Sequence, residues 1–172
     1  GRKYLSLEAG LSKGFAMSFV TAIRRMENAD LDRVLEIEKE SFVTPWTRRD
    51  WLYELTENPI NVIFVLEVIE DGIKEIAGFI DFMVTFSSST ISQIAIAKKY
   101  RKQHLGTELL NKMIEHLKNE YNEIVETITL EVRTHNQAAI AFYEKHGFEG
   151  VLIKPAYYSN GEDALYMVRR LI

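Results

Sequence analysis

The sequence contains no cysteine among its 172 residues. This absence excludes disulfide bonds, thiolate metal ligands and a cysteine nucleophile. There is also no run of about 18 apolar residues, the length that a membrane-spanning helix needs. No apolar segment with a small-residue cleavage site opens the sequence. We therefore expect a cytoplasmic protein with no membrane attachment.

The sequence has little excess charge of either sign. Its formal net charge is −4, with 47% apolar and 27% charged residues, which is ordinary for a soluble globular protein. This length is sufficient for one domain with a complete core. The mild acidity argues against direct nucleic-acid binding, which usually needs a basic face. The four histidines show no spacing typical of metal ligands, so we expect no metal site.

The first residues differ in pattern from the rest of the sequence. Residues 1–16 contain two glycines and no clear hydrophobic period, and Met17 precedes a strand-like pattern. We expect 1–16 to be an added segment or a loose N-terminal extension, and 17–172 to form the functional domain. A genuine N-terminal arm that packs on the domain is the alternative.

Hydrophobic periodicity predicts one mixed α/β domain. In the first half we expect a strand at 19–26, a helix capped by Asn28, a helix capped by Thr47 that ends near Asn58, and a hairpin of strands 60–69 and 76–86 that turns at Asp71-Gly72. A polar break at 87–89 precedes a strand at 90–97. In the second half we expect a long helix after Gly106, a strand at 127–132, a helix at 137–146 that Gly147 ends, and strands at 148–153 and 164–169.

A basic cluster stands immediately before the long helix. Five basic or potentially basic residues fall within seven positions: Lys98, Lys99, Arg101, Lys102 and His104. The first N–H groups of a helix have no intrahelical partner, and the helix dipole is positive there. This combination is typical of a phosphate site, and Gly106 allows close approach of the backbone. On charge alone, a solvated basic face on an ordinary turn remains the alternative.

The same stretch resembles the acetyl-CoA signature of the GNAT acetyltransferases. That signature is Arg or Gln, two residues, Gly, one residue, then Gly or Ala. Arg101 matches its first position and Gly106 its last, whereas His104 replaces the first glycine. The preceding SQIAIAKKYR resembles the splayed central strand of this fold. The resemblance implies a mostly antiparallel mixed sheet with flanking helices. It also implies that main-chain groups of Ile94 and Ile96 bind the pantetheine arm and that Arg101 belongs to the cofactor site. The pyrophosphate of acetyl-CoA would be bound by the backbone amides of Lys102, Gln103, His104, Leu105, Gly106 and Thr107.

A second stretch, LEVRTHNQAAIAFYEKHGF, resembles the RimI-type and archaeal protein N-terminal acetyltransferases. In these enzymes a strand glutamate is the general base and a tyrosine twelve residues later is the general acid. Glu131 and Tyr143 match both positions. By the same resemblance Asn136 and Tyr143 contact the cofactor. Two loops resemble the peptide-facing loops of these enzymes, and their residues are Phe42, Pro45, Trp46, Tyr157 and Tyr158.

Amine acetylation poses two proton-transfer problems that these residue types can solve. A carboxylate can remove the ammonium proton, and a phenol can protonate the leaving thiolate. An α-amine has a pKa of about 7.7–8.0 and a lysine amine about 10.4, so one carboxylate base suits the α-amine better. Several archaeal and eukaryotic members of the family carry a histidine or tyrosine as a helper base near the start of the splayed strand, where this sequence has Thr90. Glu131 therefore acts alone, or Glu38 or Glu40 assists it through water.

Structural interpretations compete with these roles. Glu131 could form a cross-strand ion pair with a neighbour such as Arg133, and Tyr143, Trp46 and Phe42 could be packing residues. The two tyrosines at 157 and 158 could plug a loop. For Glu131 and Tyr143 the matching interval favours a functional role.

We predict an acetyl-CoA-dependent N-acetyltransferase that acts on protein N-terminal amines, with ribosomal proteins among the candidates. We expect a monomer or weak homodimer. The alternatives are a lysine, polyamine or small-amine acceptor, and a non-catalytic acetyl-CoA sensor. A weaker alternative takes the basic cluster as an RNA contact, which would make binding strongly salt-dependent.

Overall fold

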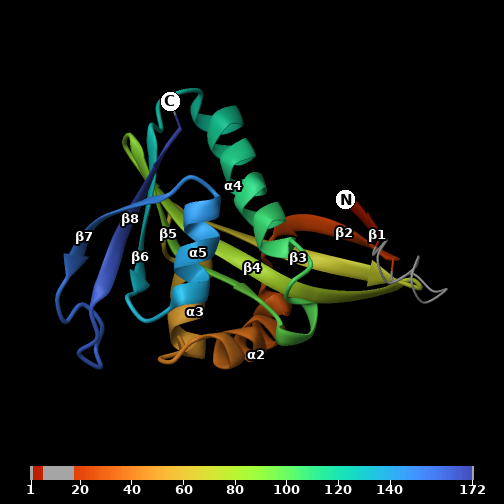
Figure 1. Ribbon diagram of the computed structural model, residues 1–172. Coiled ribbons are helices and arrows are strands. Elements are labelled where there is room, and N and C mark those ends of the chain that lie inside the picture. Colours follow the sequence, from red (N-terminus) through yellow and green to blue (C-terminus); the bar gives the residue numbers. More distant parts are fainter. Residues whose placement is uncertain (1, 6–17, 172) are drawn as a thin grey trace. The chain divides into compact units, whose positions relative to one another are not determined.

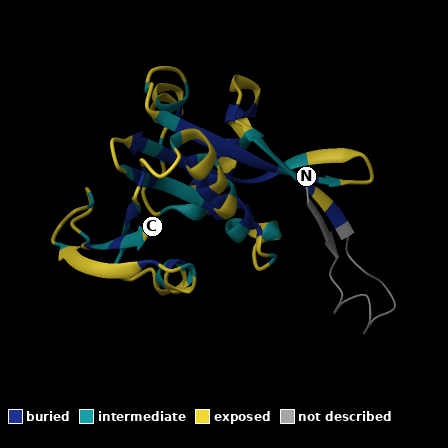
Figure 2. Cartoon of the chain, turned by 90° about the horizontal axis from the view of Figure 1, so that it is seen from above, coloured by how far each residue is buried: buried dark blue, intermediate teal, exposed yellow. Residues whose placement is uncertain are grey.

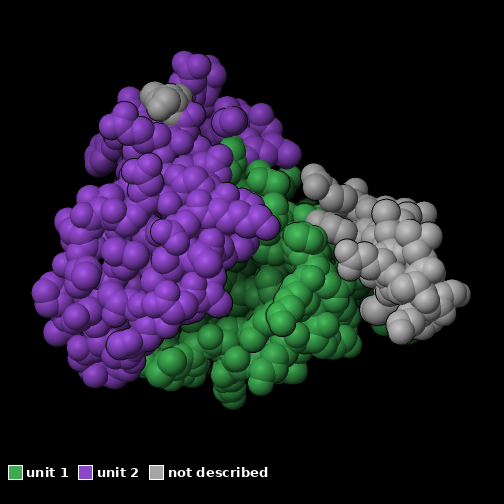
Figure 3. Space-filling model, in the orientation of Figure 1, with its two compact units in different colours: residues 1–81, 93–114 green, residues 82–92, 115–172 purple. Residues whose placement is uncertain are grey.

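The structure is a computed structural model that describes residues 2–5 and 18–171 (Figure 1). The structure divides into two compact units (Figure 3). Unit 1 comprises residues 1–81 and 93–114, and unit 2 comprises residues 82–92 and 115–172. Strands β4 (Ile73–Thr85) and β5 (Ser88–Ile96) and helix α4 (Leu105–Tyr121) contribute to both units.

The other elements belong to one unit each. Those of unit 1 are β1 (Arg2–Leu5), β2 (Ser18–Arg25), the 3-10 turn η1 (Asn28–Asp30), α2 (Leu31–Ser41), α3 (Arg48–Thr56), β3 (Asn61–Glu70) and the 3-10 turn η2 (Lys98–Tyr100). Those of unit 2 are β6 (Thr127–Arg133), α5 (Gln137–Lys145), β7 (Glu149–Lys154) and β8 (Ala164–Arg170).

The strands follow the order β1-β2-β3-β4-β5-β6-β8-β7. The pairs β1–β2, β2–β3, β6–β8 and β7–β8 are antiparallel, whereas β5 and β6 run parallel. The parallel ladder includes only three positions, from Ser88–Thr127 to Thr90–Thr129. Both strands continue beyond this ladder, so β5 is paired with β6 at its beginning only. This confirms the expected mixed, mostly antiparallel sheet with a splayed central strand.

The predicted order of elements is confirmed, with three local differences. Asn28 does not cap a helix, because it lies inside η1, where Glu27 and Asp30 form a reciprocal capping box. The predicted break at 87–89 is shorter, because β5 already begins at Ser88. Within the segment expected to be an extension, residues 2–5 form β1 against β2. The remainder of that expected segment, and Met17, lie outside the described residues.

Helix α3 shows how local sequence sets an element boundary. Thr47 accepts a hydrogen bond from the Asp50 amide at 3.2 Å, and Asp50 accepts one from the Thr47 amide at 2.8 Å. These two bonds satisfy donors that a helix N-terminus leaves unpaired. The cap places Trp51 in the first turn, where its side chain is fully buried. The predicted cap at Thr47 is therefore confirmed.

Each unit has its own buried apolar side chains. In unit 1, residues of β3, β4, α2 and α3 form one cluster around Trp51 and Phe79, whose rings lie 4.9 Å apart in an edge-to-face arrangement. In unit 2, the fully buried residues include Phe82, Leu117 and Phe148. Strand β7 contrasts with both cores, because five of its six residues are exposed (Figure 2).

Candidate active site

The predicted cofactor turn of unit 1 contains two residues other than glycine that adopt positive φ angles. Lys102 and His104 adopt φ values of +64° and +63°, in the left-handed region that glycine occupies most readily. His104 therefore adopts a glycine-like conformation at the position where the family signature has glycine. The departure in residue type does not prevent the turn from forming.

The amides of this turn lie at the start of α4. The first backbone bond of the helix runs from the Glu108 amide to the His104 carbonyl at 3.3 Å. Among the hydrogen bonds between described residues, none uses the amides of residues 102–106. These N–H groups lie at the positive end of a 17-residue helix, which is the arrangement that binds phosphate oxygens.

Several basic side chains beside the turn are held by protein partners. Lys99 pairs with Glu75 at 3.0 Å, and the Tyr100 hydroxyl donates to the same carboxylate at 2.6 Å. Arg101 donates from Nε to the Ile96 carbonyl at 2.9 Å and from its guanidinium to Ser41 at 3.2 Å. The basic cluster therefore holds the turn in place through these contacts, and it also gives the turn a positive charge. Lys98, Lys102 and His104 are exposed.

Close approach of β4 to β5 in unit 1 requires a glycine at position 78. A Cβ atom on Gly78 would lie 2.7 Å from the Ala95 carbonyl oxygen and 2.6 Å from Ile96 Cδ1. Real Cβ contacts are essentially never this short, so no side chain fits there without movement. Gly78 thus sets the position of the β5 segment that contains Ile94 and Ile96, both half-buried.

The predicted peptide loop of unit 1 is held by a buried carboxylate. Glu38 accepts hydrogen bonds from the Trp46 amide at 2.8 Å, from Trp51 Nε1 at 3.1 Å and from Gln93 Nε2 at 2.9 Å. Burial raises the pKa of Glu38, and these donors act in the opposite direction. Glu40 accepts from the Lys98 amide at 2.9 Å. Both carboxylates that could assist deprotonation are therefore already engaged in unit 1.

The loop residues themselves divide between packing and exposure. Phe42 and Trp46 are partly buried against the unit 1 core, and the Trp46 ring meets the Trp51 ring edge-on at 5.1 Å. Pro45 is exposed. Packing thus accounts for much of the surface of Phe42 and Trp46, and a role in peptide binding stays a prediction for all three residues.

In unit 2, Glu131 lies on β6 and pairs with a lysine that the sequence did not suggest. The Lys154 ammonium is 3.5 Å from Glu131 Oε1. The Glu131 side chain is 16% exposed, so it is mostly covered yet reachable. The anticipated partner, Arg133, instead pairs with Glu162 at 3.0 Å. An ion pair at Glu131 is thus present, but its partner comes from β7 rather than β6.

Tyr143 is buried in α5 among aromatic side chains. Its ring contacts Phe142 and Phe148 with both centroid distances at 5.4 Å. Burial raises the pKa of its phenol well above the ordinary value. A tyrosine in this state holds its proton more tightly than an exposed one. Packing accounts for the position of Tyr143, and its role as the acid stays a prediction.

The paired tyrosines of unit 2, Tyr157 and Tyr158, pack against each other and against an arginine. The Arg133 guanidinium lies 3.9 Å above the centre of the Tyr158 ring, and the two tyrosine rings meet edge-on at 5.0 Å. Burial raises the pKa of Tyr158 to about 12. Burial and the neighbouring Glu131 carboxylate also raise the pKa of Tyr157. Both phenols therefore remain neutral hydrogen-bond donors.

Two further predicted positions are engaged inside unit 2. The side-chain oxygen of Asn136 caps α5 by accepting from the Ala139 amide at 3.1 Å, so its expected contact with the cofactor stays a prediction. Thr90 lies 3.0 Å, oxygen to oxygen, from Thr129. This bond fixes Thr90 on the parallel ladder.

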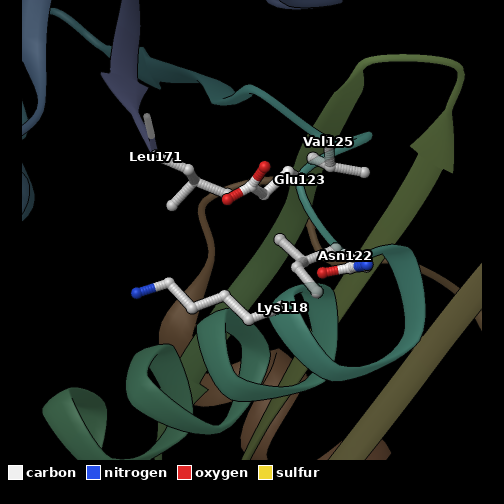
Figure 4. Close-up of a pocket in the computed structure, with 6 residues that line it drawn as sticks. Lys118, Asn122, Glu123, Val125 and Leu171 are labelled. Carbon is white, nitrogen blue, oxygen red and sulfur yellow. The ribbon is translucent and has the colours of Figure 1, made fainter.

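A separate cavity of unit 2 lies at the C-terminal end of α4 (Figure 4). Its volume is about 330 Å³, and it is lined by Leu117, Lys118, Asn122, Glu123, Val125 and Leu171. None of the predicted site residues is among them. Residues 2–5 and 18–171 contain no cluster of metal-ligating side chains and no helix long and apolar enough to cross a membrane.

Comparison with known proteins decides the family. Residues 31–148 match the Acetyltransferase (GNAT) family. This chain belongs to the GNAT acetyltransferases. The match includes the cofactor turn, Glu131 and Tyr143, and the resemblance found in the sequence is therefore confirmed.

Individual relatives of this GNAT chain include named N-acetyltransferases. A Bacillus subtilis protein provisionally named a ribosomal protein bS18-alanine N-acetyltransferase is 38% identical over 152 residues, covering 88% of this chain and 96% of its own length. An N-alpha-acetyltransferase of Saccharolobus solfataricus is 29% identical, with coverage of 87% and 92%. The crystal structure of the Escherichia coli ribosomal-protein-S18-alanine N-acetyltransferase superposes with a TM-score of 0.75 at 31% identity, with coverage of 88% and 94%.

Proposed function

We propose that this GNAT chain transfers the acetyl group of acetyl-CoA to the N-terminal α-amine of a protein. The observation that carries the proposal is the state of Glu131 and Tyr143. The first is a mostly covered carboxylate already in contact with a primary ammonium, and the second is a phenol buried between Phe142 and Phe148. They supply the base and the acid that amine acetylation requires. The named relatives support the same acceptor class.

Acetyl-CoA is assigned to unit 1. The free amides of residues 102–106 and the positive end of α4 suit its pyrophosphate. The exposed Lys98 and Lys102 add positive charge beside them. Main-chain groups of β5 around Ile94 and Ile96 are assigned to the pantetheine arm. Arg101 acts on the turn, since its guanidinium is bonded to protein acceptors.

The reaction is direct attack of the amine on the thioester. The acceptor ammonium first gives a proton to Glu131, directly or through one water. The neutral amine then forms the N–C bond while the C–S bond breaks, and the Tyr143 hydroxyl protonates the leaving CoA thiolate. The new amide nitrogen gives up its extra proton, which restores the Tyr143 hydroxyl through water, and Glu131 releases the first proton to solvent. The Tyr157–Tyr158 loop and the loop with Phe42, Pro45 and Trp46 are assigned to the peptide.

The test is thiol release from acetyl-CoA with short peptides that vary in their first residue. Each peptide is paired with a control that is identical except for an α-acetyl group. Turnover only with free α-amines supports the proposal and ranks the accepted first residues. Turnover on blocked peptides that contain lysine moves the acceptor to side chains. No turnover despite tight acetyl-CoA binding leaves a small-amine acceptor or a sensor.

A further inference from the structure

Lys154 turns its side chain from the end of β7 toward the proposed base. Its ammonium lies 3.5 Å from Glu131 Oε1, 4.5 Å from the centre of the Tyr166 ring and 5.6 Å from the centre of the Tyr157 ring. One carboxylate and two aromatic faces thus surround a single primary ammonium.

The strand register explains how a residue of β7 reaches a residue of β6. Tyr166 on β8 lies opposite Glu131 on one side and opposite Leu152 on the other. Opposed residues share a face of a sheet, as do residues two apart on one strand. Lys154 therefore shares the face of Glu131 and Tyr166. Its own opposed residue is Ala164, whose short side chain leaves room for the lysine to lie across β8.

These partners are those that bind an alkylammonium in general. A carboxylate supplies a charge-assisted hydrogen bond, and aromatic faces attract the cation through their quadrupoles. The nearby cation Arg133 is held by Tyr158 and Glu162. The Lys154 side chain is 38% exposed, so it can leave this position for solvent at small cost.

We propose that Glu131, Tyr157 and Tyr166 form an ammonium site in unit 2 that Lys154 fills in the free enzyme and that the acceptor amine takes over. This inference rests on the proposed function, in which Glu131 accepts the proton of the acceptor. Lys154 is then an internal competitor of the substrate. The fraction of enzyme in which Lys154 occupies the site reduces the apparent affinity for the acceptor.

The steady-state test compares Lys154→Met with the wild type on a peptide that has a free α-amine. Partly exposed ion pairs are weak, so we expect KM for the peptide to fall about three- to fivefold with kcat within about twofold. Lys154→Arg retains the cation and keeps KM near the wild-type value. Lys145→Met, at an exposed position of α5, is the matched control and changes neither constant. An unchanged or higher KM in Lys154→Met overturns the inference.

A second measurement needs no turnover. The side-chain ¹⁵N resonance of Lys154, assigned by its loss in Lys154→Arg, is recorded in the wild type and in Glu131→Gln. We expect butylammonium to shift it in the wild type toward its position in Glu131→Gln, whereas N-acetylbutylamine has no effect. If no peptide is acetylated, the proposed function fails and this comparison decides the inference. A resonance that neither Glu131→Gln nor butylammonium moves overturns it.

Discussion

Replacement of His104 by glycine should remove backbone strain from the cofactor turn. His104 holds a φ of +63°, and a left-handed conformation costs a residue with a Cβ atom roughly 1–2 kcal/mol. Glycine avoids this cost but loses roughly 0.5–1 kcal/mol more conformational entropy on folding. The net gain is about 0.5–1 kcal/mol, which corresponds to a rise in Tm of about 1–4 °C for a chain of this size.

Thermal and urea unfolding of three matched variants measure this gain. Lys102→Gly shares the positive φ and should also stabilise the protein. Gln103→Gly lies between them without a positive φ, so it should destabilise the protein. Affinity for acetyl-CoA should change less than about twofold in His104→Gly, because the backbone carries the contacts. If Gln103→Gly stabilises as much as His104→Gly, the strain argument is refuted.

Three other predictions concern the two proposed catalytic residues, and also Asp81 and Gly78. Glu131→Gln and Tyr143→Phe should each lower kcat about 100-fold or more while acetyl-CoA affinity, measured by calorimetry, stays within twofold; full activity would remove that residue from the mechanism. Burial raises the pKa of the Asp81 carboxyl to about 8, whereas its value in the unfolded chain is about 3.9. Between about pH 4 and 8 the folded protein therefore keeps a proton that the unfolded chain has lost. The free energy of unfolding should fall by about 1.4 kcal/mol for each pH unit in this range. Urea unfolding of Asp81→Asn should lose this slope, and an equal slope would contradict the assignment. Gly78→Ala should destabilise by about 1–3 kcal/mol in calorimetry, and wild-type stability would show that β5 can move away.

The sequence was sufficient for most of the fold because its signals are local. Hydrophobic periodicity located α4, and the cap at Thr47 needed only the residues of its own turn. The prediction that Asn28 caps a helix was wrong because the capping box forms one residue earlier, between Glu27 and Asp30. Arg24 holds Asp30 with two hydrogen bonds at 2.7 and 2.8 Å and so favours this box. All of these residues are close in sequence, so the choice between neighbouring caps depends on side-chain contacts rather than on hydrophobic period.

Site residues could be predicted where they lie in one contiguous motif. Contacts between side chains from different strands could not. The interval from Glu131 to Tyr143 is a local feature. The partner of Glu131 is not, because Lys154 reaches it only through the register of β6, β8 and β7. Glu38 was likewise expected as a helper of the base, whereas it accepts hydrogen bonds from Trp46, Trp51 and the distant Gln93 and so holds a loop. In both cases the sequence shows a charged residue on a strand or helix, but it does not show which residue binds it.

The proposed acceptor is an α-amine rather than a lysine side chain. One peptide that carries both a free N-terminus and an internal lysine distinguishes the two. The peptide is incubated with acetyl-CoA and the enzyme, and tandem mass spectrometry locates the acetyl group. We predict a single acetyl group on the α-nitrogen, formed about 100-fold or more slowly in a parallel reaction with Glu131→Gln. Acetylation of the lysine side chain, with the α-amine left free, would contradict it.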